Sequence, residues 1–511
     1  MSASAPIPNW LDHRGRACPD QPAIVAGAEV MTYGVLARRA RLTAGRLARL
    51  GVTRGSRVAV LLRGGAAFAE IMHGLARLGA VLVPLDRRLT PHELRQQCEG
   101  AGAELLVYDH GTRELAAQIE PTPRRLCCGG DAIAGDGALD AIIPADDTGD
   151  ARHDLASVHS IIFTSGSSGT AKGVLLTYGN HYWSATASAF NLGLQRDDRW
   201  LACLPFCHVG GLSILLRSVI YGTTAVIHDG FDPERVNYSI EAERVTIISV
   251  VANMLQRMLA ARGPRPYPPW LRCVLLGGGP APRPLLEDCA ACGVPVIQTY
   301  GLTEAASQVT ALAPGDALRK LGSAGQPLLA TEVALAGVRT GLGREAVGEI
   351  TIRGPTITRA YLDGRATTDA EGWLHTGDLG CFDAEGFLYV IGRRDELIIS
   401  GGENIHPAEI EAALQAHPAV AEVCVVGVPD PRWGEAVTAC VRLRPGAALT
   451  AAALQAAARR LLAGFKVPRR VLLVEDFPRT AAGKIMRGRV RAQLAGAAPA
   501  GGLHLDFSVG G

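Results

Sequence analysis

Short apolar runs that alternate with amphipathic stretches dominate the first 300 residues. Buried-strand patterns occur at RVAVLLR (57–63) and AVLVPLD (80–86), and each is followed by a helical pattern, at 66–79 and 91–102. Further short runs rich in β-branched residues lie at 160–165, 224–229, 245–251, 272–278 and 294–300. Strands that alternate with helices predict parallel sheets with both faces covered.

After Arg393 the pattern becomes that of a small α+β unit. Ile410 and Leu414 share one face of a helix that starts near Pro407, and Thr450 is placed to cap a second helix that runs through Leu462. Three strands are expected at 421–430, 437–444 and 470–478. No internal repeat is evident.

The length supports more than one domain, since 511 residues exceed the roughly 250–300 that one hydrophobic core can organise. We predict an α/β fold with a large N-terminal domain, residues 1–394, and a small C-terminal α+β domain, residues 395–511. The acidic, glycine-punctuated segment 131–154 is interpreted as a solvated connection between two halves of the large domain. The Gly/Ala-rich stretch 496–511 is expected to be a loose tail.

Charge and composition exclude several classes of protein. A formal charge of +2 gives no global footprint for nucleic acid or an acidic membrane surface. The longest uncharged apolar run, 200–216, is interrupted by Pro205 and His208 and is too short to span a bilayer. No signal segment is apparent and the twelve cysteines are scattered, so we expect a cytoplasmic protein with reduced thiols. Cys289 and Cys292 form a CxxC that is interpreted as small apolar helix filler.

A serine- and glycine-rich loop follows the strand pattern at 160–165 and precedes what is expected to be a helix. Glycines let backbone N–H groups turn towards a phosphate, hydroxyls add donors, and a lysine adds charge. The loop is not a Walker A motif, because Ala171 stands where that motif has glycine. The residues expected to bind a polyphosphate are Thr164, Ser165, Gly166, Ser167, Ser168, Gly169, Thr170 and Lys172.

This loop resembles the phosphate-binding signature of the adenylate-forming (ANL) superfamily, which includes acyl-CoA synthetases, nonribosomal-peptide adenylation domains and luciferases. Ser168 replaces a common threonine and Ala171 a common proline, and both departures are mild. Further motifs of the superfamily recur in order: QTYGLTEAAS (298–307), GWLHTGDLG (372–380), GRRDELIISGGENIHPAEIE (392–411) and PRTAAGKIMRG (478–488). The resemblance implies the two-domain adenylate-forming fold with a mobile C-terminal domain.

The resemblance implies that a carboxylate attacks the α-phosphate of ATP to give an acyl-adenylate and pyrophosphate. In this reaction Tyr300 would stack on adenine, Thr303 would reach the α-phosphate, and Glu304 would hold Mg²⁺ with help from Thr164. Neighbouring backbone at Thr299 and Gly301, and the wall formed by Gly277, Gly278 and Gly279, would complete the nucleotide site. A tight turn is the alternative reading of the three glycines.

Three further residues are implied from the later motifs. Asp378 can accept hydrogen bonds from both ribose hydroxyls, and Arg393 would hold ribose or phosphate oxygens. Lys484, on a glycine-containing loop, would bridge the attacking carboxylate and the α-phosphate and stabilise the charge that develops there.

The second half-reaction transfers the acyl group to coenzyme A. The resemblance implies that the small domain rotates about a hinge at Asp395, which removes Lys484 and presents a glycine loop to a pantetheine tunnel. The residues expected at this tunnel are Gly401, Gly402 and Glu403. No cysteine nucleophile is required, because the thiol belongs to coenzyme A.

Three stretches, 204–222, 275–289 and 298–328, resemble more narrowly the o-succinylbenzoate–CoA ligases of menaquinone biosynthesis. Such an acid needs an apolar slot and donors for the carboxylate that does not react. The acid-binding candidates are His208, which is also a catalytic candidate, Ser213, Arg217, Ser307 and Thr310. Arg217 could instead cap the helix that precedes it.

Other interpretations remain open at this point. The chain could be a CoA ligase for another aromatic or medium-chain acid, a stand-alone adenylation protein that loads a carrier protein, or a nucleotide sensor without enzymatic activity. The expected small molecules are ATP, Mg²⁺, coenzyme A and a carboxylic acid. Nucleic acid is not an expected partner, and a homodimer or larger homo-oligomer is possible.

Overall fold

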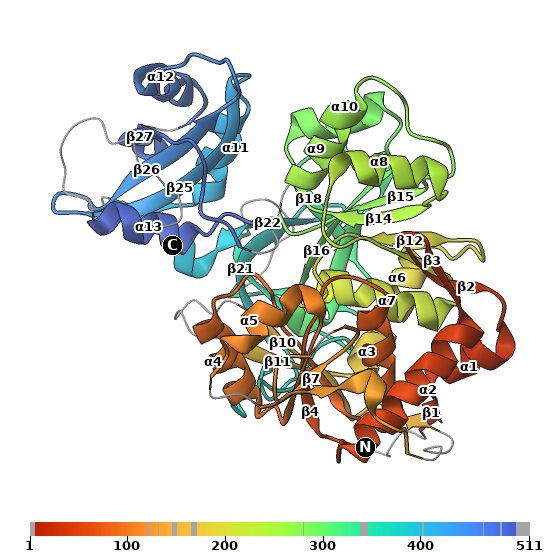
Figure 1. Cartoon of the computed structure of the whole chain (residues 1–511). Helices are drawn as coiled ribbons and strands as arrows, with labels where there is room; N and C mark the ends of the chain where they lie inside the picture. Colours follow the sequence, from red (N-terminus) through yellow and green to blue (C-terminus); the bar gives the residue numbers. More distant parts are fainter. Residues whose placement is uncertain are drawn as a thin grey trace.

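The computed structural model describes residues 6–120, 123–130, 132–145, 151–164, 171–279, 281–337, 346–400, 403–462, 464–480 and 483–496. Figure 1 shows a large domain, built from the elements β1 to β22, and a small domain at the C-terminal end of the chain, built from β23 to α13. The predicted α/β class, with a large sheet-rich domain and a small C-terminal one, is confirmed.

One sheet of the large domain has seven strands, and its central strands are parallel as the sequence predicts. In spatial order they are β11 (Lys172–Thr177), β10 (Val158–Thr164), β5 (Val81–Pro84), β4 (Arg57–Leu61), β6 (Leu105–Tyr108), β7 (Arg124–Cys127) and β8 (Gly137–Ala138). A separate short pair joins β1 (Ile7–Pro8) to β9 (Arg152–His153).

A second sheet of thirteen strands runs through the rest of the large domain. Its parallel part is β16 (Val296–Leu302), β15 (Cys273–Leu276), β14 (Ile247–Val250), β12 (Arg199–Ala202), β13 (Thr224–Ile227) and β2 (Pro22–Ala26), edged by antiparallel β3 (Glu29–Thr32). Beyond β16 it continues antiparallel as β17 (Ser307–Leu312), β18 (Ser323–Pro327), β22 (Leu388–Arg393), β21 (Leu374–Phe382), β20 (Gly348–Arg353) and β19 (Glu332–Ala336).

Helices cover these sheets, as buried parallel strands require. They are α1 (Trp10–Ala17), α2 (Tyr33–Arg49), α3 (Ala66–Leu78), α4 (Pro91–Ala101), α5 (Arg113–Ala117), α6 (Tyr178–Leu192), α7 (Val209–Tyr221), α8 (Pro233–Ala242), α9 (Ala252–Arg262) and α10 (Arg283–Ala291). The main hydrophobic core combines residues of α2, α3 and α7 with strands of both sheets. Buried Cys289 lies on α10, where burial raises its thiol pKa to about 12, in keeping with an inert filler.

Two sequence interpretations in this region are wrong. The segment 131–154 does not separate two halves, because β8 within it joins the seven-stranded sheet and β10 after it pairs with β5 of the same sheet. The phosphate loop is followed by strand β11 rather than by a helix. Helix α6 begins only at Tyr178, where Thr177 and Asn180 form a reciprocal capping box.

A cluster of uncharged rings lies in the core between α1, β9, β10 and α6. His153 stacks on Tyr178 with ring centroids 4.4 Å apart, and His159 meets Tyr178 and His181 edge-on at 4.9 Å. All four side chains are buried. Burial lowers the pKa of His153 and His181 to about 3 and that of His159 well below its usual value, so the imidazoles are held neutral.

The small domain has a five-stranded sheet of β24 (Glu403–Ile405), β23 (Ile398–Ser400), β26 (Gly434–Leu443), β25 (Val420–Asp430) and β27 (Arg470–Leu473). Three helices accompany it: α11 (Pro407–Gln415), α12 (Ala451–Leu461) and α13 (Arg487–Gly496). The predicted cap is confirmed, since the Thr450 hydroxyl accepts a hydrogen bond from Ala453 N. The tail 497–511 lies outside the described residues.

A half-buried ion network lies at the base of this domain. Arg487 Nη1 lies 2.5 Å from Glu411 Oε1 and donates to Val425 O at 2.8 Å, while Arg487 Nε lies 3.0 Å from Glu396 Oε2. Glu396 belongs to the short 3₁₀ turn η5 (Arg394–Glu396) that leads out of β22. Helix α13 is therefore fastened both to its own sheet and to the connection between the domains.

Candidate functional site

Three of the nucleotide-binding candidates, one on each of the strands β16, β21 and β22, form one hydrogen-bonded group. The Tyr300 hydroxyl donates to Asp378 Oδ2 at 2.6 Å, and Arg393 Nε lies 3.0 Å from Asp378 Oδ1. Burial and the charge of Asp378 raise the pKa of Tyr300 far above its usual value, so the hydroxyl remains a donor. Asp378 itself is 7% exposed. The group presents an aromatic ring, a carboxylate and a guanidinium together.

Glu304 lies just beyond this group, in the 3₁₀ turn η3 (Thr303–Ala305) that follows β16. The Tyr361 hydroxyl donates to Glu304 Oε1 at 3.1 Å, and Thr358 N donates to Glu304 O at 2.8 Å. Burial, together with the charge of Glu304, raises the pKa of Tyr361 and keeps its hydroxyl protonated. No described residue donates to Glu304 Oε2, which leaves an oxygen of the kind that Mg²⁺ prefers.

Tyr361 contacts a candidate site residue, and the sequence analysis did not predict it. It connects Glu304 with the strand that leaves the phosphate loop, because Tyr361 bridges Val174 of β11 and Leu362 N donates to Gly173 O at 2.8 Å. Its only sequence signal is an aromatic residue in the irregular stretch before Asp363, which does not by itself indicate a partner 57 positions away.

The phosphate loop lies mostly outside the described residues: Ser165, Gly166, Ser167, Ser168, Gly169 and Thr170 cannot be placed. Its two ends are described. Thr164 closes β10 and Lys172 opens β11, the two are paired across the strands, and Thr164 Oγ1 donates to Lys172 O at 3.5 Å. The strands β10 and β11 therefore form a β-hairpin, with the Thr164 hydroxyl and the Lys172 ammonium group at the ends that flank the loop.

Glycines allow close backbone approach beside this group. A Cβ placed on Gly301 would lie 1.8 Å from Ser307 O, so only glycine fits there. Gly278, between Gly277 and Gly279 after β15, has φ +81°, which favours glycine over other residues. This conformation is compatible both with a backbone surface beside adenine and with a tight turn that has only a structural role. Thr299 is engaged in the sheet, where its hydroxyl donates to Thr310 O at 2.7 Å.

The acid-binding candidates lie on β17 and at or within α7. Several of them already form hydrogen bonds with other residues of the protein. Arg217 is 2% exposed and lies within α7, four residues before its end, so the expected alternative of a helix cap is wrong. Its Nη2 donates to Ser184 Oγ at 3.1 Å, which in turn donates to Ala306 O at 2.8 Å. This chain of bonds supports the left-handed backbone of Ala306, at φ +53°, next to Glu304.

Two of the remaining hydroxyl candidates already donate hydrogen bonds to backbone carbonyls. Thr310 is fully buried and its hydroxyl donates to Ala324 O at 2.6 Å. The Ser213 hydroxyl donates to Gly210 O at 3.2 Å within α7. Ser307 is half-buried at the start of β17 and has φ +126°, a strained value for serine that is typical of functional sites.

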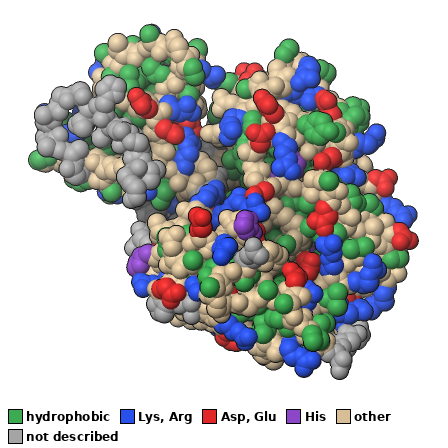
Figure 2. Space-filling model, viewed as in Figure 1, with side chains coloured by type: hydrophobic (Ala, Val, Ile, Leu, Met, Phe, Trp, Pro, Cys, Tyr) green, Lys and Arg blue, Asp and Glu red, His purple; other side chains and the backbone are tan. Residues whose placement is uncertain are grey.

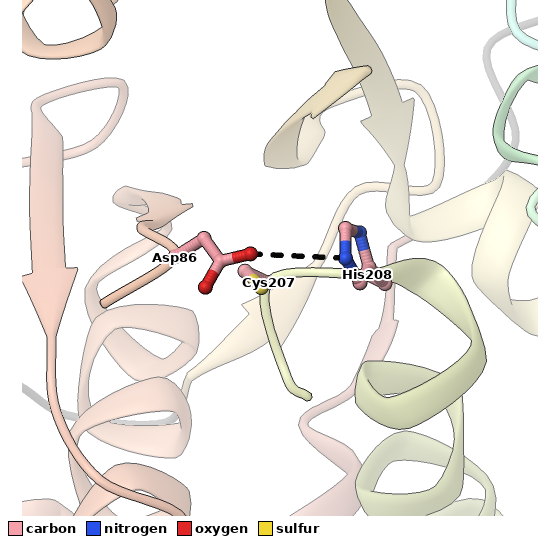
Figure 3. A group of neighbouring side chains, drawn as sticks. All are labelled: Asp86, Cys207 and His208. Atoms are coloured by element: carbon pink, nitrogen blue, oxygen red, sulfur yellow. Dashed lines mark ion pairs between the residues drawn. The ribbon is translucent and has the colours of Figure 1, made fainter. Parts of the chain in front are cut away.

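His208 stands at the start of α7 and faces Asp86, with Cys207 between them (Figure 3). His208 Nε2 lies 3.9 Å from Asp86 Oδ2 and has no hydrogen-bond partner among the described residues. Burial lowers the pKa of His208 and the charge of Asp86 opposes that shift. His208 Nε2 is therefore a buried nitrogen whose hydrogen-bonding capacity no described residue uses.

The same three side chains place possible metal ligands within 4.8 Å of one another. Two observations disfavour a metal centre. Arg88 Nε already binds Asp86 Oδ1 at 3.0 Å, which adds a positive charge beside the carboxylate. Burial raises the pKa of the Cys207 thiol, whereas metal binding requires the thiolate.

The residues expected to act from the small domain lie apart from the nucleotide group. Lys484 is exposed in a turn closed by Thr480 N donating to Lys484 O at 2.7 Å, and it makes no described contact with Tyr300, Asp378 or Arg393. Gly401 and Gly402 lie outside the described residues, as do the side chains of Glu403 and Asp395.

On the face of the molecule drawn in Figure 2, Lys and Arg side chains are interspersed with Asp and Glu.

Sequence comparison places the chain among known proteins. The profile of the AMP-binding enzyme family matches residues 11–362, and that of the AMP-binding enzyme C-terminal domain matches residues 409–484. The 2-succinylbenzoate–CoA ligase of Geobacillus kaustophilus is 46% identical over 488 residues, which cover 95% of this chain and 97% of the relative. No helix in the described part of the chain is long and apolar enough to cross a membrane.

Solved structures give a consistent result. The o-succinylbenzoate-CoA synthetase of Bacillus subtilis in complex with its acyl-adenylate intermediate superposes with a TM-score of 0.88 at 37% identity, covering 98% of this chain and 100% of that chain. The same enzyme with ATP and magnesium ion gives a TM-score of 0.87 at 37% identity, covering 96% and 100%. A fatty acyl CoA synthetase of Mycobacterium tuberculosis gives 0.73 at 31% identity, covering 95% and 97%.

Proposed function

We propose, from the premise that this chain belongs to the AMP-binding enzyme family, that it is an ATP-dependent acid–CoA ligase that converts 2-succinylbenzoate to its CoA thioester in menaquinone biosynthesis. The predicted relation to the adenylate-forming superfamily is confirmed. The observation that carries the proposal is the 46% identity to a 2-succinylbenzoate–CoA ligase across 95% of this chain. ATP, Mg²⁺ and coenzyme A are its reaction partners.

The first step that we propose joins the acid to AMP. A carboxylate oxygen bonds to the α-phosphorus of ATP while the bond to pyrophosphate breaks. Tyr300 would stack on adenine, and Asp378 and Arg393, already hydrogen-bonded together, would hold the ribose. The phosphate loop 164–172 would receive the triphosphate, with Gly277 to Gly279 beside the base.

Charge stabilisation falls to four residues in this proposal. Thr303 would donate to the α-phosphate, and Lys484 would bridge the carboxylate and the phosphate as negative charge accumulates there. Glu304 Oε2 and Thr164 Oγ1 suit Mg²⁺, which when bound offsets the charge of the phosphates. Tyr361 would keep the Glu304 carboxylate oriented.

The second step forms the thioester. The sulfur of coenzyme A bonds to the acyl carbon, AMP leaves with the bonding electrons, and the thiol proton passes to solvent. We propose that the small domain turns about Asp395 between the steps, so that Lys484 leaves and Gly401, Gly402 and Glu403 approach the pantetheine arm. An Asp395→Pro variant, which fixes the backbone there, should retain adenylation and lose thioester formation. Loss of both steps together would contradict the hinge.

The acid pocket is proposed to lie between α7 and β17. His208 Nε2 is a buried nitrogen without a described hydrogen-bond partner, whereas Arg217 acts through Ser184 on the carbonyl of Ala306, two residues after Glu304. Ser213, Ser307 and Thr310 complete the candidate wall. A His208→Ala variant should raise KM for the acid more than it lowers the rate of ATP–pyrophosphate exchange at saturating acid.

A CoA ligase for another aromatic or medium-chain acid is the second candidate, favoured by the 31% identity to a fatty acyl CoA synthetase. ATP–pyrophosphate exchange with a panel of acids, followed by detection of the thioester with free coenzyme A, separates the two. Exchange with benzoates or fatty acids but not with 2-succinylbenzoate would overturn the proposed acid. Exchange without any thioester would instead favour an enzyme that loads a carrier protein.

We also propose a cytoplasmic location and a homodimeric or larger assembly. All twelve cysteines are free thiols, which fits a reducing compartment. Light scattering coupled to size-exclusion chromatography would measure the assembly.

A further inference from the structure

We infer that two ion pairs confine the proposed domain rotation to one residue, Asp395. The residue before it, Arg394, pairs with Glu349 of the large domain, and we call this pair the large-domain clamp. The residue after it, Glu396, pairs with Arg487 of the small domain, and we call this pair the small-domain clamp. The inference rests on the proposed two-step activity and deepens it, because it names the residues that position the hinge.

The large-domain clamp is built on a carboxylate that is nearly buried. Glu349 lies on β20, beside β21, and its side chain is 12% exposed. Its Oε1 accepts from Gly377 N at 3.0 Å, and its Oε2 lies 3.1 Å from Arg394 Nη1 and 3.3 Å from His375 Nδ1. Ion pairs between fully exposed side chains contribute little. Here only Arg394 is exposed, and its acceptor is oriented by a backbone N–H.

The same carboxylate reaches the nucleotide group. Gly377, which donates to Glu349, has φ +74° and directly precedes Asp378. Asp378 is paired across β21 and β22 with Arg393, whose Nε lies 3.0 Å from Asp378 Oδ1. Two consecutive arginines, Arg393 and Arg394, are therefore held by carboxylates of the large domain. The fixed part of the chain extends as far as residue 394.

The small-domain clamp begins one residue after Asp395. Glu396 Oε2 lies 3.0 Å from Arg487 Nε at the start of α13. The same guanidinium pairs with Glu411 of α11 and donates to Val425 O of β25 at 2.8 Å. A planar guanidinium that has three partners keeps a fixed orientation. The moving part of the chain therefore starts at Glu396, and its anchor lies three residues after Lys484.

One residue remains between the two clamps. Within the described part of the chain, neither Arg394 nor Glu396 forms an ion pair with the opposite domain. The backbone of a single residue has two soft dihedral angles, so the joint allows few orientations. A longer flexible joint would spread the small domain over many orientations and lower the population of each productive one. The clamps thus keep the small domain in the orientations that the two half-reactions use.

The test asks whether releasing a clamp restores a blocked hinge. Asp395→Pro alone should lose thioester formation, because its backbone cannot turn at residue 395. Adding Glu396→Gln breaks the small-domain clamp, so the chain can turn at residue 396 instead. The rate of thioester formation from supplied acyl-adenylate should then rise about tenfold above that of Asp395→Pro, in keeping with the loss of one charge-assisted bond. A substitution that only destabilised the protein would not restore activity.

The large-domain clamp is tested in the same way. Arg394→Ala added to Asp395→Pro should also restore thioester formation about tenfold, because the chain can then turn before residue 395. Arg394→Lys, which keeps the charge beside Glu349, should restore less.

Two other ion pairs provide matched controls. Glu409→Gln breaks the pair of Glu409 with Lys466 inside the small domain, and Arg353→Ala breaks the pair of Arg353 with Glu332 in the sheet that contains Glu349. Neither pair flanks Asp395, so neither substitution should restore thioester formation to Asp395→Pro.

Amide hydrogen exchange gives a measurement that does not depend on the proline variant. In the otherwise wild-type chain, Arg394→Ala and Glu396→Gln should each raise the exchange rates of amides 394–398 about tenfold and leave the rest of both domains unchanged. A rise spread over the whole small domain would show that the pair stabilises that domain rather than the hinge, and would overturn the inference. Absence of recovery in both double variants would also overturn it.

Failure of the inference can be told from failure of the proposed function. Wild-type protein that forms no thioester with any acid would refute the ligase activity. If Asp395→Pro retains adenylation and loses thioester formation, but neither clamp substitution restores it, the hinge stands and only the clamps are refuted.

Discussion

The large and small domains differ in how their functional side chains are held. In the large domain, Tyr300, Asp378 and Arg393 bond to one another, and Tyr361 holds Glu304, so the group is arranged before any ligand binds. In the small domain, the hydrogen bonds of Lys484 within the described part of the chain stay inside its own turn, and the Arg469 guanidinium lies over the half-buried ring of Trp433. The proposed mechanism, in which two successive reactions occur at one centre, requires such a fixed nucleotide site and groups that move with a second domain.

Replacing Lys484 tests this division most strongly. Lys484→Ala should lower adenylate formation by about 10²–10³-fold, the effect typical of losing one group that stabilises transition-state charge. Conversion of supplied acyl-adenylate to thioester should be retained. Pyrophosphate exchange and thioester assays measure the two steps separately, and an equal loss in both would place Lys484 with the fixed site instead.

Acid should unfold the large domain before the small one. The folded-state pKa values of His153, His159 and His181 lie below the unfolded value of about 6.5, so the neutral forms stabilise the fold above pH 6.5 and this stability is lost as pH falls. For His153 and His181, whose pKa values are lowered to about 3, the loss should be about 1.4 kcal/mol per pH unit between pH 6.5 and pH 3. Calorimetry from pH 7 to pH 4 would measure it.

A His181→Gln variant sharpens this experiment, because glutamine keeps a polar group near Ser160, which lies 3.0 Å from His181 Nε2, and cannot take up a proton there. Its unfolding should depend less on pH than that of the wild type. A shallow pH dependence in the wild type, equal in both domains, would contradict the assigned role of the buried rings.

A smaller effect is expected at Tyr361. Tyr361→Phe removes the hydrogen bond to the Glu304 carboxylate and should raise the Mg²⁺ concentration needed for half-maximal adenylation about tenfold, since hydrogen bonds to charged groups contribute about 1.5–3 kcal/mol. Titration calorimetry of Mg²⁺ with a non-hydrolysable ATP analogue gives a readout independent of turnover. Tyr267→Phe is the matched control, because it removes a tyrosine hydrogen bond to Asn237, and neither residue is a candidate site residue.

The smallest expected change concerns the stability of the small domain alone. Thr450→Ala removes the cap of α12 and should lower the free energy of unfolding by about 1 kcal/mol. The melting transition of the small domain should shift while pyrophosphate exchange at 25 °C does not. A shift of the large-domain transition instead would mean that the two domains unfold as one unit.

Local patterns predicted much of this fold, and contacts between distant segments explain the rest. The strands at 57–63 and 80–86 and the cap at Thr450 follow from hydrophobic spacing and side-chain chemistry nearby. The strands β8 and β11 were missed, because each is a short edge strand of the seven-stranded sheet that pairs with one neighbouring strand, and its own residue pattern does not indicate that pairing.

The candidate site shows the same limit. Motifs indicated Tyr300, Glu304 and Asp378, because each of these residues lies in a short motif whose residue types point to its chemistry. The bond from Tyr361 to Glu304 and the chain from Arg217 through Ser184 to Ala306 join separate elements, and only the fold brings them together.

Trp433 has a consequence for spectroscopy. The chain has six tryptophans, and this is the one that follows residue 395. Incorporation of 5-fluorotryptophan would give one ¹⁹F resonance from the small domain against five from the large one. Its assignment needs a single variant, Trp433→Phe. The small domain thus contains its own label, by which the tumbling of this domain could be followed through the two half-reactions.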